Sequence, residues 1–375
     1  MQFFTAKNIV YSLFFASILI VLLLIAIFYQ NSLSEKNIVS GRNNITSELP
    51  LNINSFKPSN SSSDNVLAEE TITKINHSSS NSIDTSRDGN FNMLFTGDNM
   101  LGRSIAERIE NGEDPYMGVK EFLQSYNLVY ANFETSMGEK NEGKAQTGKA
   151  YTFKTPLKTM EILKNANISI LGLANNHIRD YGSDVLSKML DRFESNGFTY
   201  FGAGKNTEDA FKVKYLEYEG TKLAFLGING IEGVYNDAKA STPGGSYFDD
   251  TRIKALLKEA KLSADVVIVV PHFGTERSKT SNDFQKKYAH MFVDNGADIV
   301  IGMHAHVIQD TEKYKGKYIY YSLGNYVFEE GPITNTGLNI GITIKDKKIS
   351  EIKEYEIKIK NSFPDTTTFK KIIQM

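Results

Sequence analysis

Short apolar runs alternate with segments of helical periodicity from residue 91 onward, and this alternation restricts the possible folds more than any other feature of the chain. The segment 249–262 has the i, i+3, i+4, i+7 spacing of an amphipathic helix, at Ile253, Leu256, Leu257 and Ala260. Strands are expected at 91–96, 128–132, 168–174, 223–228, 265–270 and 298–301, and further helices at 156–166, 183–196 and 281–295. Strands and helices in alternation favour a largely parallel sheet that is covered by helices.

Only strand-like runs follow residue 301, at 307–314, 318–322, 338–344 and 349–359. This change in pattern predicts an antiparallel layer that closes the domain. We therefore expect one α/β domain at 91–360, followed by a C-terminal tail at 361–375.

Polar residues stand directly after five of the apolar runs, in the segments 95–103, 131–134, 174–180, 270–276 and 302–306. In open α/β sheets, ligands bind beyond the carboxyl ends of the strands. These five segments are therefore where we expect a functional site.

The histidines are concentrated in the same segments. Of the six in the chain, His77 precedes the domain, His290 lies in an expected helix, and four follow strands: His177, His272, His304 and His306. A lone histidine of this kind is more often structural than a ligand, but four of them, with Asp98 and Glu134 at equivalent strand ends, reverse that preference. The chain has no cysteine, which excludes disulfides, thiolate metal sites and a cysteine nucleophile. Histidine, carboxylate and Asn oxygen suit Mn²⁺, Mg²⁺, Fe or Zn²⁺.

Two of these histidines, His304 and His306, are separated by one residue. On extended backbone their rings would point to opposite faces, so both can reach one site only if the chain turns there. Gly302, just before them, favours such a turn.

Seven motifs in order make the sequence resemble the CapA family of poly-γ-glutamate capsule biosynthesis proteins, whose domain belongs to the calcineurin-like metallophosphoesterase superfamily. They lie between about residues 91 and 328, and are Gly97-Asp98-x-Met100-Leu101-Gly102-Arg103, Asn132-Phe133-Glu134, Ala174-Asn175-Asn176-His177-x-x-Asp180-x-Gly182, Pro271-His272-Phe273-Gly274-x-Glu276, Gly296-Ala297-Asp298, His304-Ala305-His306-Val307-x-Gln309 and Tyr321-Ser322-Leu323-Gly324-Asn325-Tyr326-Val327-Phe328. The resemblance implies a four-layer α/β/β/α sandwich of metallophosphoesterase type.

The resemblance also implies metal ligands. Asp98 would bind a first cation, and Glu134 would bridge two cations at a place usually held by Asp. The remaining ligands are Asn176, His272 and His304 for the second cation and His306 for the first. In the superfamily the first motif is Asp-x-His, whereas this chain has Met100 at the third position, so the first cation lacks a ligand and one or two sites are expected.

Four further residues have implied roles. His177, held by Asp180, would stand beside the leaving group as a proton donor. Arg103 would clamp a substrate phosphate or carboxylate, or else simply begin a helix and pair with a surface acid. Glu276 would contact substrate or orient His272. The segment 322–325 is expected to pack against the site as a strand and turn, with a direct catalytic role as the less favoured interpretation.

The N-terminal region differs sharply from this domain. Residues 9–30 carry no charge and are long enough to cross a hydrocarbon core of about 30 Å. A cleaved signal peptide is the alternative, but 29–33 offer no A-x-A-like cleavage site. Only Lys7 and the terminal amine precede the helix, so we expect a short cytoplasmic tail at 1–8, a signal-anchor helix at 9–30 and an extracellular domain at the cell membrane.

Residues 31–90 read as a disordered linker. They contain 11 Asn, 14 Ser and a single aromatic, Phe56, with no sustained apolar period. Such a segment cannot bury enough surface to offset its ordering entropy. A linker that hides short strands is the less favoured interpretation.

The expected function follows from the resemblance. It is a membrane-anchored component of poly-γ-glutamate capsule synthesis or export, working with membrane-embedded synthetase and export proteins and with an anionic polymer as substrate. Two alternatives stay open: a metal-dependent hydrolase of phosphoester or amide bonds in an envelope polymer, and a non-catalytic assembly factor with a vestigial metal site. The formal net charge of −2 argues against nucleic acid as a partner.

Overall fold

The computed structural model describes residues 73–74, 89–231, 233–329, 331 and 335–375. The predicted tail at 1–8, the spanning helix at 9–30 and most of the linker at 31–90 lie outside these residues. Within the described part of the chain, no helix has the length and apolar character needed to cross a bilayer. Inside the predicted linker, Thr73–Lys74 form a two-residue strand, β1, that pairs in parallel with β9 (Lys214–Tyr218). The linker prediction is wrong at these two residues, since a pairing this short leaves no periodic signal.

One sheet has seven strands in the order β1-β9-β10-β12-β13-β15-β14. Its centre is parallel: β10 (Thr221–Asn229), β12 (Val266–His272), β13 (Ile299–Ile301) and β15 (Lys317–Tyr320). At opposite edges, β9 and β14 (Thr311–Tyr314) pair antiparallel with their neighbours.

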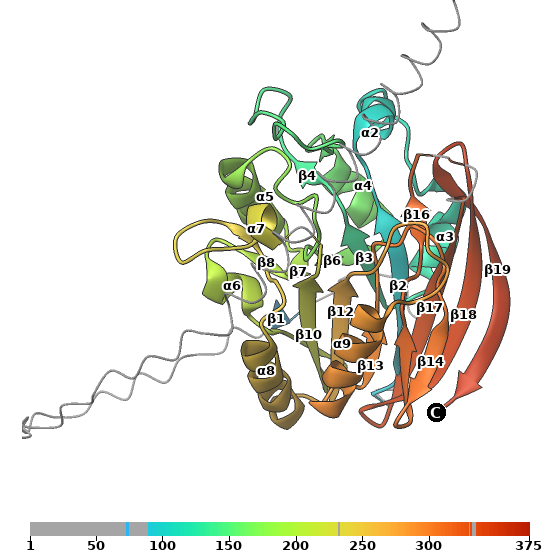
Figure 1. Ribbon diagram of the computed structural model, residues 1–375. Coiled ribbons are helices and arrows are strands. Elements are labelled where there is room, and N and C mark those ends of the chain that lie inside the picture. Colours follow the sequence, from blue (N-terminus) through green and yellow to red (C-terminus); the bar gives the residue numbers. More distant parts are fainter. Residues whose placement is uncertain (1–72, 75–88, 232, 330, 332–334) are drawn as a thin grey trace, which may run out of the picture. The chain divides into compact units, whose positions relative to one another are not determined.

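The second sheet has eight strands, in the order β19-β18-β17-β2-β3-β6-β7, with β16 (Asn325–Val327) paired to β2. Four strands run parallel to one another: β2 (Phe91–Asn99), β3 (Leu128–Phe133), β6 (Ile168–Gly172) and β7 (Thr199–Phe201). Three long antiparallel strands complete it: β17 (Thr336–Lys345), β18 (Lys348–Lys360) and β19 (Phe363–Gln374). Figure 1 shows these three strands side by side.

The helices are short and lie in the connections. They are α2 (Arg103–Glu110), α3 (Lys120–Gln124), α4 (Thr159–Asn165), α5 (Ser183–Ser195), α6 (Thr207–Phe211), α7 (Gly233–Asn236), α8 (Asp250–Ser263) and α9 (Asp283–Asp294), with a 3-10 turn η1 at Met117–Val119. Two-residue strands β4 (Ser136–Met137), β5 (Lys154–Thr155), β8 (Ala203–Gly204) and β11 (Gly244–Gly245) form two small pairs. Three helices, α6, α8 and α9, begin at a side-chain cap, and α9 has a capping box between Asn282 and Gln285.

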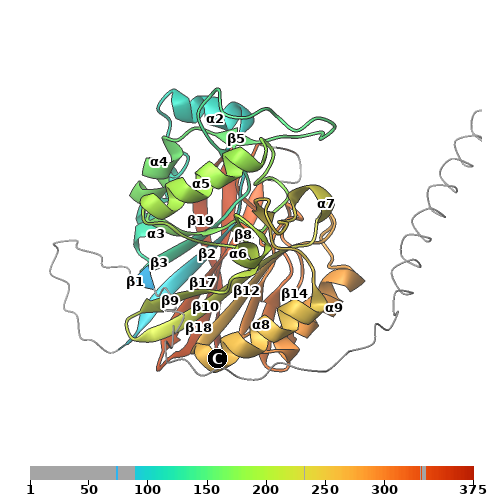
Figure 2. The same ribbon diagram turned by 90° about the vertical axis from the view of Figure 1, so that its left-hand side faces the viewer.

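Three apolar cores separate four layers. On β2, Met93 and Phe95 belong to a core shared with Phe225 and Ile268 of the other sheet, while Leu94 points to the helices on the outer face. This outer core unites the second sheet with α2 to α5, and a third core unites the first sheet with α8 and α9. Figure 2 shows α4 and α5 on one side of the strands and α8 and α9 on the other. The layers are therefore helix, sheet, sheet and helix.

The predicted strands and helices of 91–301 are present, but two expectations about the C-terminal part are wrong. The late strands do not form a layer of their own. Instead, β15 pairs with β13 in one sheet and β17 pairs with β2 in the other. The late strands therefore extend both sheets. The expected tail at 361–375 is the edge strand β19, which is solvated on both faces and so lacks the apolar alternation that marks a half-buried strand.

The segment 322–325 passes between the two sheets. It fits there because three residues that it passes closely are glycines, which have no side chain. A Cβ at Gly97 would lie 2.1 Å from the Gly324 carbonyl oxygen, and one at Gly302 would lie 2.1 Å from that of Tyr321. At Gly337 it would lie 1.9 Å from the Asn325 oxygen. These three close approaches fix the segment against both sheets.

The first test concerns this close packing. We expect Gly97→Ala to lower the free energy of unfolding by about 3 kcal/mol, because a buried backbone atom must move to admit the methyl group. Urea unfolding followed by circular dichroism measures the change. Gly245→Ala is the matched control, since a Cβ at this buried glycine meets no atom closer than 3.4 Å, and should change stability by less than about 1 kcal/mol. Equal effects of the two substitutions would contradict this account of the segment.

Candidate functional site

The structure gathers the predicted ligands at the carboxyl ends of parallel strands from both sheets. Asp98 lies at the end of β2 and Glu134 follows β3, while His272 ends β12. The loops after β6 and β13 supply the rest, which are Asn176, His177, Asp180, His304 and His306. All eight side chains are buried. Each sheet alone would hold only part of the set.

One group of ligand atoms surrounds Nε2 of His272. This nitrogen lies 2.9 Å from Oδ1 of Asn176, 3.2 Å from Nδ1 of His304 and 3.6 Å from Oε1 of Glu134. The resemblance assigned these residues to the second cation. These oxygen and nitrogen atoms face one another, which is the arrangement that a shared cation requires.

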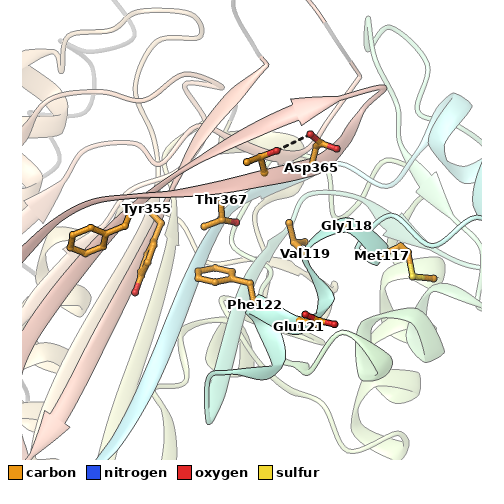
Figure 3. A pocket seen from close by; sticks show the side chains of 10 residues that line it. Met117, Gly118, Val119, Glu121, Phe122, Tyr355, Asp365 and Thr367 are labelled. Atoms are coloured by element: carbon orange, nitrogen blue, oxygen red, sulfur yellow. Dashed lines mark hydrogen bonds between the residues drawn. The ribbon is translucent and has the colours of Figure 1, made fainter.

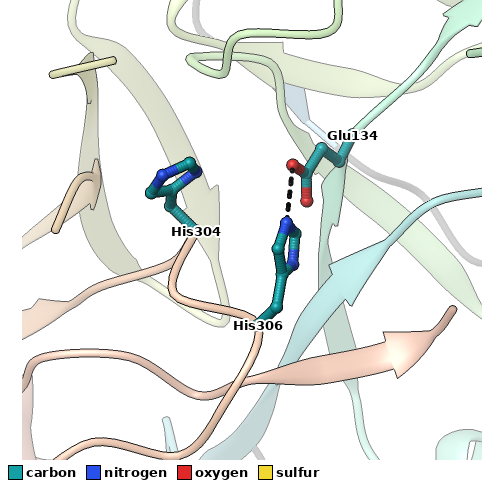
Figure 4. A group of neighbouring side chains, drawn as sticks. All are labelled: Glu134, His304 and His306. Carbon is teal, nitrogen blue, oxygen red and sulfur yellow. Dashed lines mark ion pairs between the residues drawn. The ribbon is translucent and has the colours of Figure 1, made fainter. Parts of the chain in front are cut away.

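The other group contains Asp98 and His306. Oδ2 of Asp98 lies 3.1 Å from Nδ1 of His306, and Nε2 of His306 lies 3.7 Å from Oε1 of Glu134. Figure 4 shows the ring of His306 pointing at the Glu134 carboxylate, with His304 on the other side. Asp98 also accepts hydrogen bonds from the Asn132 amide, at 2.8 Å, and from the backbone N–H of His304, at 3.2 Å.

The turn that the two histidines require is present. His304 has φ +95° and His306 has φ +56°. Both are in the left-handed region that non-glycine residues rarely adopt, which costs of the order of 1–3 kcal/mol for each such residue. This backbone brings both rings to the same site.

Glu134 provides the test of whether a cation fits. Its carboxylate is fully buried, and neither oxygen has a hydrogen-bond partner. Burial, reinforced by the charge of Asp98, raises the pKa of Glu134 well above its ordinary value. Two sets of ligand atoms share this residue, Glu134 with His304 and His306, and Glu134 with Asp98 and His272, each within 4.8 Å. A divalent cation would supply the positive charge that compensates for burying this carboxylate, so the residues fit a metal.

The charges within the cluster shift its histidines in opposite directions. Burial, followed by the neighbouring His304 and His306, holds the pKa of His272 well below its ordinary value. Burial and then His306 do the same to the pKa of His304. For His306, burial lowers the pKa, but Glu134 and Asp98 outweigh it and raise the value to about 9.

The residues after Asp98 do not supply the missing ligand. Asn99 donates to the carbonyl of Gly97 at 2.7 Å and accepts from the Tyr116 hydroxyl at 3.0 Å. Met100 is buried in the core with α2 to α5, and its sulfur accepts the backbone N–H of Gly102. Both side chains therefore make their contacts with residues outside the ligand set.

His177 and Asp180 form a hydrogen-bonded pair beside the cluster, with Nδ1 2.7 Å from Oδ2. Asp180 also accepts the backbone N–H of Phe153 at 2.7 Å, and the Phe153 ring packs on the imidazole at 4.2 Å. Burial lowers the pKa of His177 despite the opposing effect of Asp180. With Nδ1 bound to the carboxylate, Nε2 is the nitrogen left for proton transfer.

The two predicted substrate residues, Arg103 and Glu276, are exposed, unlike the ligands. Arg103 begins α2 at φ +55°, pairs with Glu329 at 3.1 Å and lies over the Tyr151 ring at 5.5 Å. The structure therefore agrees with the interpretation in which Arg103 begins a helix and pairs with a surface acid. Its guanidinium is not a free group that waits to clamp a substrate. Glu276 is exposed on the loop after β12, and its charge helps to raise the pKa of Glu134.

Sequence reasoning missed two residues that support the site. Lys149 donates to Oδ1 of Asp180 at 2.7 Å and also to the backbone carbonyl of Asn176. Asn236 donates to the same carbonyl at 2.9 Å. Lys149 lies in an irregular loop and Asn236 ends the four-residue helix α7. Neither segment has a motif or a periodicity, so the sequence gives no signal for them.

The loop that carries Lys149 is firmly held. Arg192 donates two hydrogen bonds of 2.7 Å to Glu142. The ammonium of Lys154 donates to the carbonyls of Glu139, Lys140 and Glu142, at 2.9 to 3.1 Å. Lys149 is thus fixed beside Asp180 by contacts made elsewhere in its loop.

Figure 3 shows a surface groove between α3 and the strands β18 and β19. Met117, Phe122 and Tyr355 contribute apolar side chains, and Glu121 and Asp365 contribute carboxylates. None of the residues lining it is among those predicted for the site. The buried ligand cluster is therefore the stronger candidate for chemistry.

The second test uses the raised pKa of His306. Its ion pairs stabilise the fold fully below about pH 6.5, and this stabilisation disappears as the pH rises through about 9. In chelator-treated protein, urea unfolding should therefore show wild type exceeding His306→Gln by on the order of 1–3 kcal/mol more at pH 6 than at pH 10. His177→Gln is the control: the pKa of His177 is lowered, so its difference from wild type should not change between pH 8 and 10. A constant difference for His306→Gln would refute the assignment.

The third test concerns Lys149. We expect Lys149→Met to cost about 3–5 kcal/mol of folding free energy, because it leaves the buried Asp180 carboxylate without its cation. Lys149→Arg keeps the charge and should cost clearly less. Lys144→Met removes an exposed lysine of the same loop and should stay within about 0.5 kcal/mol of wild type in the same urea titration. A neutral Lys149→Met would show that Asp180 does not depend on this lysine.

Comparison with known proteins identifies relatives. The family model described as bacterial capsule synthesis protein PGA_cap matches residues 92–330. The chain is 35% identical over 240 residues to the PGA biosynthesis protein CapA of Bacillus subtilis (strain 168), covering 63% of both chains. It is 33% identical over 248 residues to the capsule biosynthesis protein CapA of Bacillus anthracis, covering 64% of this chain and 60% of that one. The chain thus aligns with less than two thirds of each relative's length.

Among solved structures, the chain is similar to a putative 5'-nucleotidase from Staphylococcus aureus in complex with alpha-ketoglutarate. The identity is 13% and the TM-score 0.42, with 76% of this chain and 54% of that chain covered. For the NAD nucleotidase NadN of Haemophilus influenzae the identity is 12% and the TM-score 0.38, with 76% and 50% covered. At these TM-scores the two structures support no inference about this chain's fold or function.

Proposed function

Because this chain belongs to the bacterial capsule synthesis protein PGA_cap family, we propose that it is a membrane-anchored, extracytoplasmic component of poly-γ-glutamate capsule synthesis or export. In this proposal its domain has a fold of metallophosphoesterase type and binds one or two divalent cations. The names of its two Bacillus relatives support the pathway. The ligand cluster supports the metal.

The observation that carries the metal site is the buried Glu134 carboxylate. It has no hydrogen bond and is shared by two sets of ligand atoms. A fold that served only as a scaffold would gain stability by replacing this residue with an apolar or amide side chain. Retaining a buried carboxylate without a hydrogen bond is favourable if a cation binds there.

The proposed location rests on the sequence. Residues 9–30 are uncharged and long enough to cross a bilayer, and the domain that follows would stand outside the cell. Membrane-embedded proteins that make and export the polymer would be its partners. The substrate would be the anionic polymer itself.

We assign separate roles to the residues of the site. Asp98, Glu134 and His306 would hold a first cation, and Asn176, His272 and His304, with Glu134, a second. When bound, such cations lower the pKa of a coordinated water and stabilise developing negative charge. Asp180 accepts from Nδ1 of His177 and so presents Nε2. Since burial lowers the pKa of this imidazole, it starts neutral, and it accepts a proton before it can deliver one to a leaving group.

One observation favours the hydrolase alternative, namely the His177–Asp180 pair. It stands next to Asn176, and Lys149 and the Phe153 ring hold it in place. A site that only binds polymer has no need of an oriented imidazole. Hydrolysis of a phosphoester or amide bond in an envelope polymer is therefore the second candidate.

The fourth test is genetic complementation. Deleting the gene should abolish cell-surface polyglutamate, measured by immunostaining and by glutamate content after acid hydrolysis. A double variant, Asp98→Ala with His272→Ala, should fail to restore the polymer because it removes a ligand from each half of the cluster. The control Glu312→Gln changes an acid that pairs with His290 instead of the cluster and should restore it fully.

The outcomes separate the three functions. Unchanged polymer in the deletion strain would overturn the capsule proposal. Full complementation by the double variant, present at the wild-type level, would favour the assembly factor. If His177→Ala alone fails to complement while the protein stays folded and binds Mn²⁺, the hydrolase candidate gains support.

A further inference from the structure

Asn325 is a buried polar residue of the 322–325 segment whose side chain reaches His306 at two points. Its Oδ1 lies 3.0 Å from Nδ1 of His306, and its Nδ2 donates to the His306 backbone carbonyl at 3.2 Å. The residue is fully buried. One amide group therefore holds both the ring and the backbone of the same histidine.

The backbone contact matters because His306 is in a strained conformation. Its φ of +56° is in the left-handed region, which is unfavourable for a residue with a Cβ. The hydrogen bond from Asn325 ties down the carbonyl of this residue. It thereby helps to keep the turn that brings His304 and His306 to the same site.

The ring contact fixes which nitrogen faces the cluster. An amide oxygen only accepts hydrogen bonds, so Nδ1 of His306 must carry a proton to bond with it. When a cation displaces the second proton of the ring, the lone pair is therefore on Nε2, which points toward Glu134. Histidines that bind metals usually donate their second ring N–H to a partner that fixes their orientation.

We propose that Asn325 is a positioning residue that orients His306, so that Nε2 is the atom offered to a cation at Glu134. This inference rests on the metal site of the proposed function. Asn325 acts through His306 and is not itself a ligand, because its oxygen lies against Nδ1, whereas Glu134 lies toward Nε2.

Asp98 is a second acceptor for the same ring N–H, but it is not equivalent to Asn325. Its Oδ2 lies 3.1 Å from the same Nδ1 and already accepts the N–H of His304. Asp98 is also an expected ligand of the first cation, which needs its lone pairs. An acceptor that does not bind the cation keeps the Nδ1 proton in place when Asp98 does. This matters most in a first site that lacks the ligand expected at Met100.

The fold supplies Asn325 with a rigid support. Its Cα pairs with that of Asp98 in the register between β16 and β2. Gly97 and Gly337 allow the close backbone approaches that fix the segment. On the other side, the Phe328 ring packs on His306 at 4.5 Å. The histidine is therefore held between two residues of one motif.

The fifth test compares Mn²⁺ binding by calorimetry in the full chain. Asn325→Leu should weaken binding about 10- to 100-fold, as loss of a partner behind a ligand typically does. Asn325→Asp keeps an acceptor for Nδ1 but loses the donor to the His306 carbonyl, so it should weaken binding less than Asn325→Leu does. Asn339→Leu removes a buried Asn of neighbouring β17 and should leave affinity unchanged. Thermal melting of each apo variant verifies that it is folded.

A second measurement uses wild-type protein only and does not depend on a variant folding. In the Zn²⁺-loaded protein, ¹⁵N NMR of labelled histidines should show His306 bound through Nε2 with a proton on Nδ1. Binding through Nδ1 would overturn the inference, as would wild-type Mn²⁺ affinity in folded Asn325→Leu. A loss in Asn325→Asp as large as that in His306→Ala would also overturn it. If wild type itself binds neither metal, the proposed metal site fails, and that result is distinct from a failure at Asn325.

Discussion

A carboxylate buried without a hydrogen bond is the constraint around which this structure is organised. Glu134 is fully enclosed, and histidine nitrogens lie 3.6 and 3.7 Å from its Oε1. Removing such a charge from water costs several kcal/mol unless an opposite charge compensates for it. The positive charge of His306 compensates in part, and a divalent cation can do so more fully. The unusual charge states of the cluster follow from this one requirement.

The ligand cluster forms only if the two sheets keep their positions relative to each other. Asp98 and Glu134 come from one sheet, and His272, His304 and His306 come from the other or from its loops. Their apolar faces pack on a shared core, and the 322–325 segment is wedged between them by close contacts with glycine. Apolar packing is not directional, and it determines how the layers stack. The 322–325 segment and the polar contacts of Asn325 determine the geometry of the ligands.

Much of the fold could be predicted because burial imposes a visible period. The strands at 91–96 and 265–270 and the helix at 249–262 appear in the structure as β2, β12 and α8 within a few residues. The predictions failed where burial is weak. β19 is exposed on both faces and β1 is only two residues long, so neither leaves a pattern. Arg103 has a partner, Glu329, which is 226 residues away in the chain, and spacing cannot reveal such a contact.

The sequence by itself determined the class of fold and the set of candidate ligands, because strand ends in an α/β sheet converge wherever the strands are parallel. It also identified the departure at Met100. Only the tertiary structure shows how close the ligand atoms lie to Glu134, which nitrogen of each histidine faces inward, and that Lys149, Asn236 and Asn325 support them. The physical reason is distance along the chain. Periodicity records whether a residue is buried, whereas a hydrogen bond between residues 19 to 60 positions apart depends on how the whole chain packs.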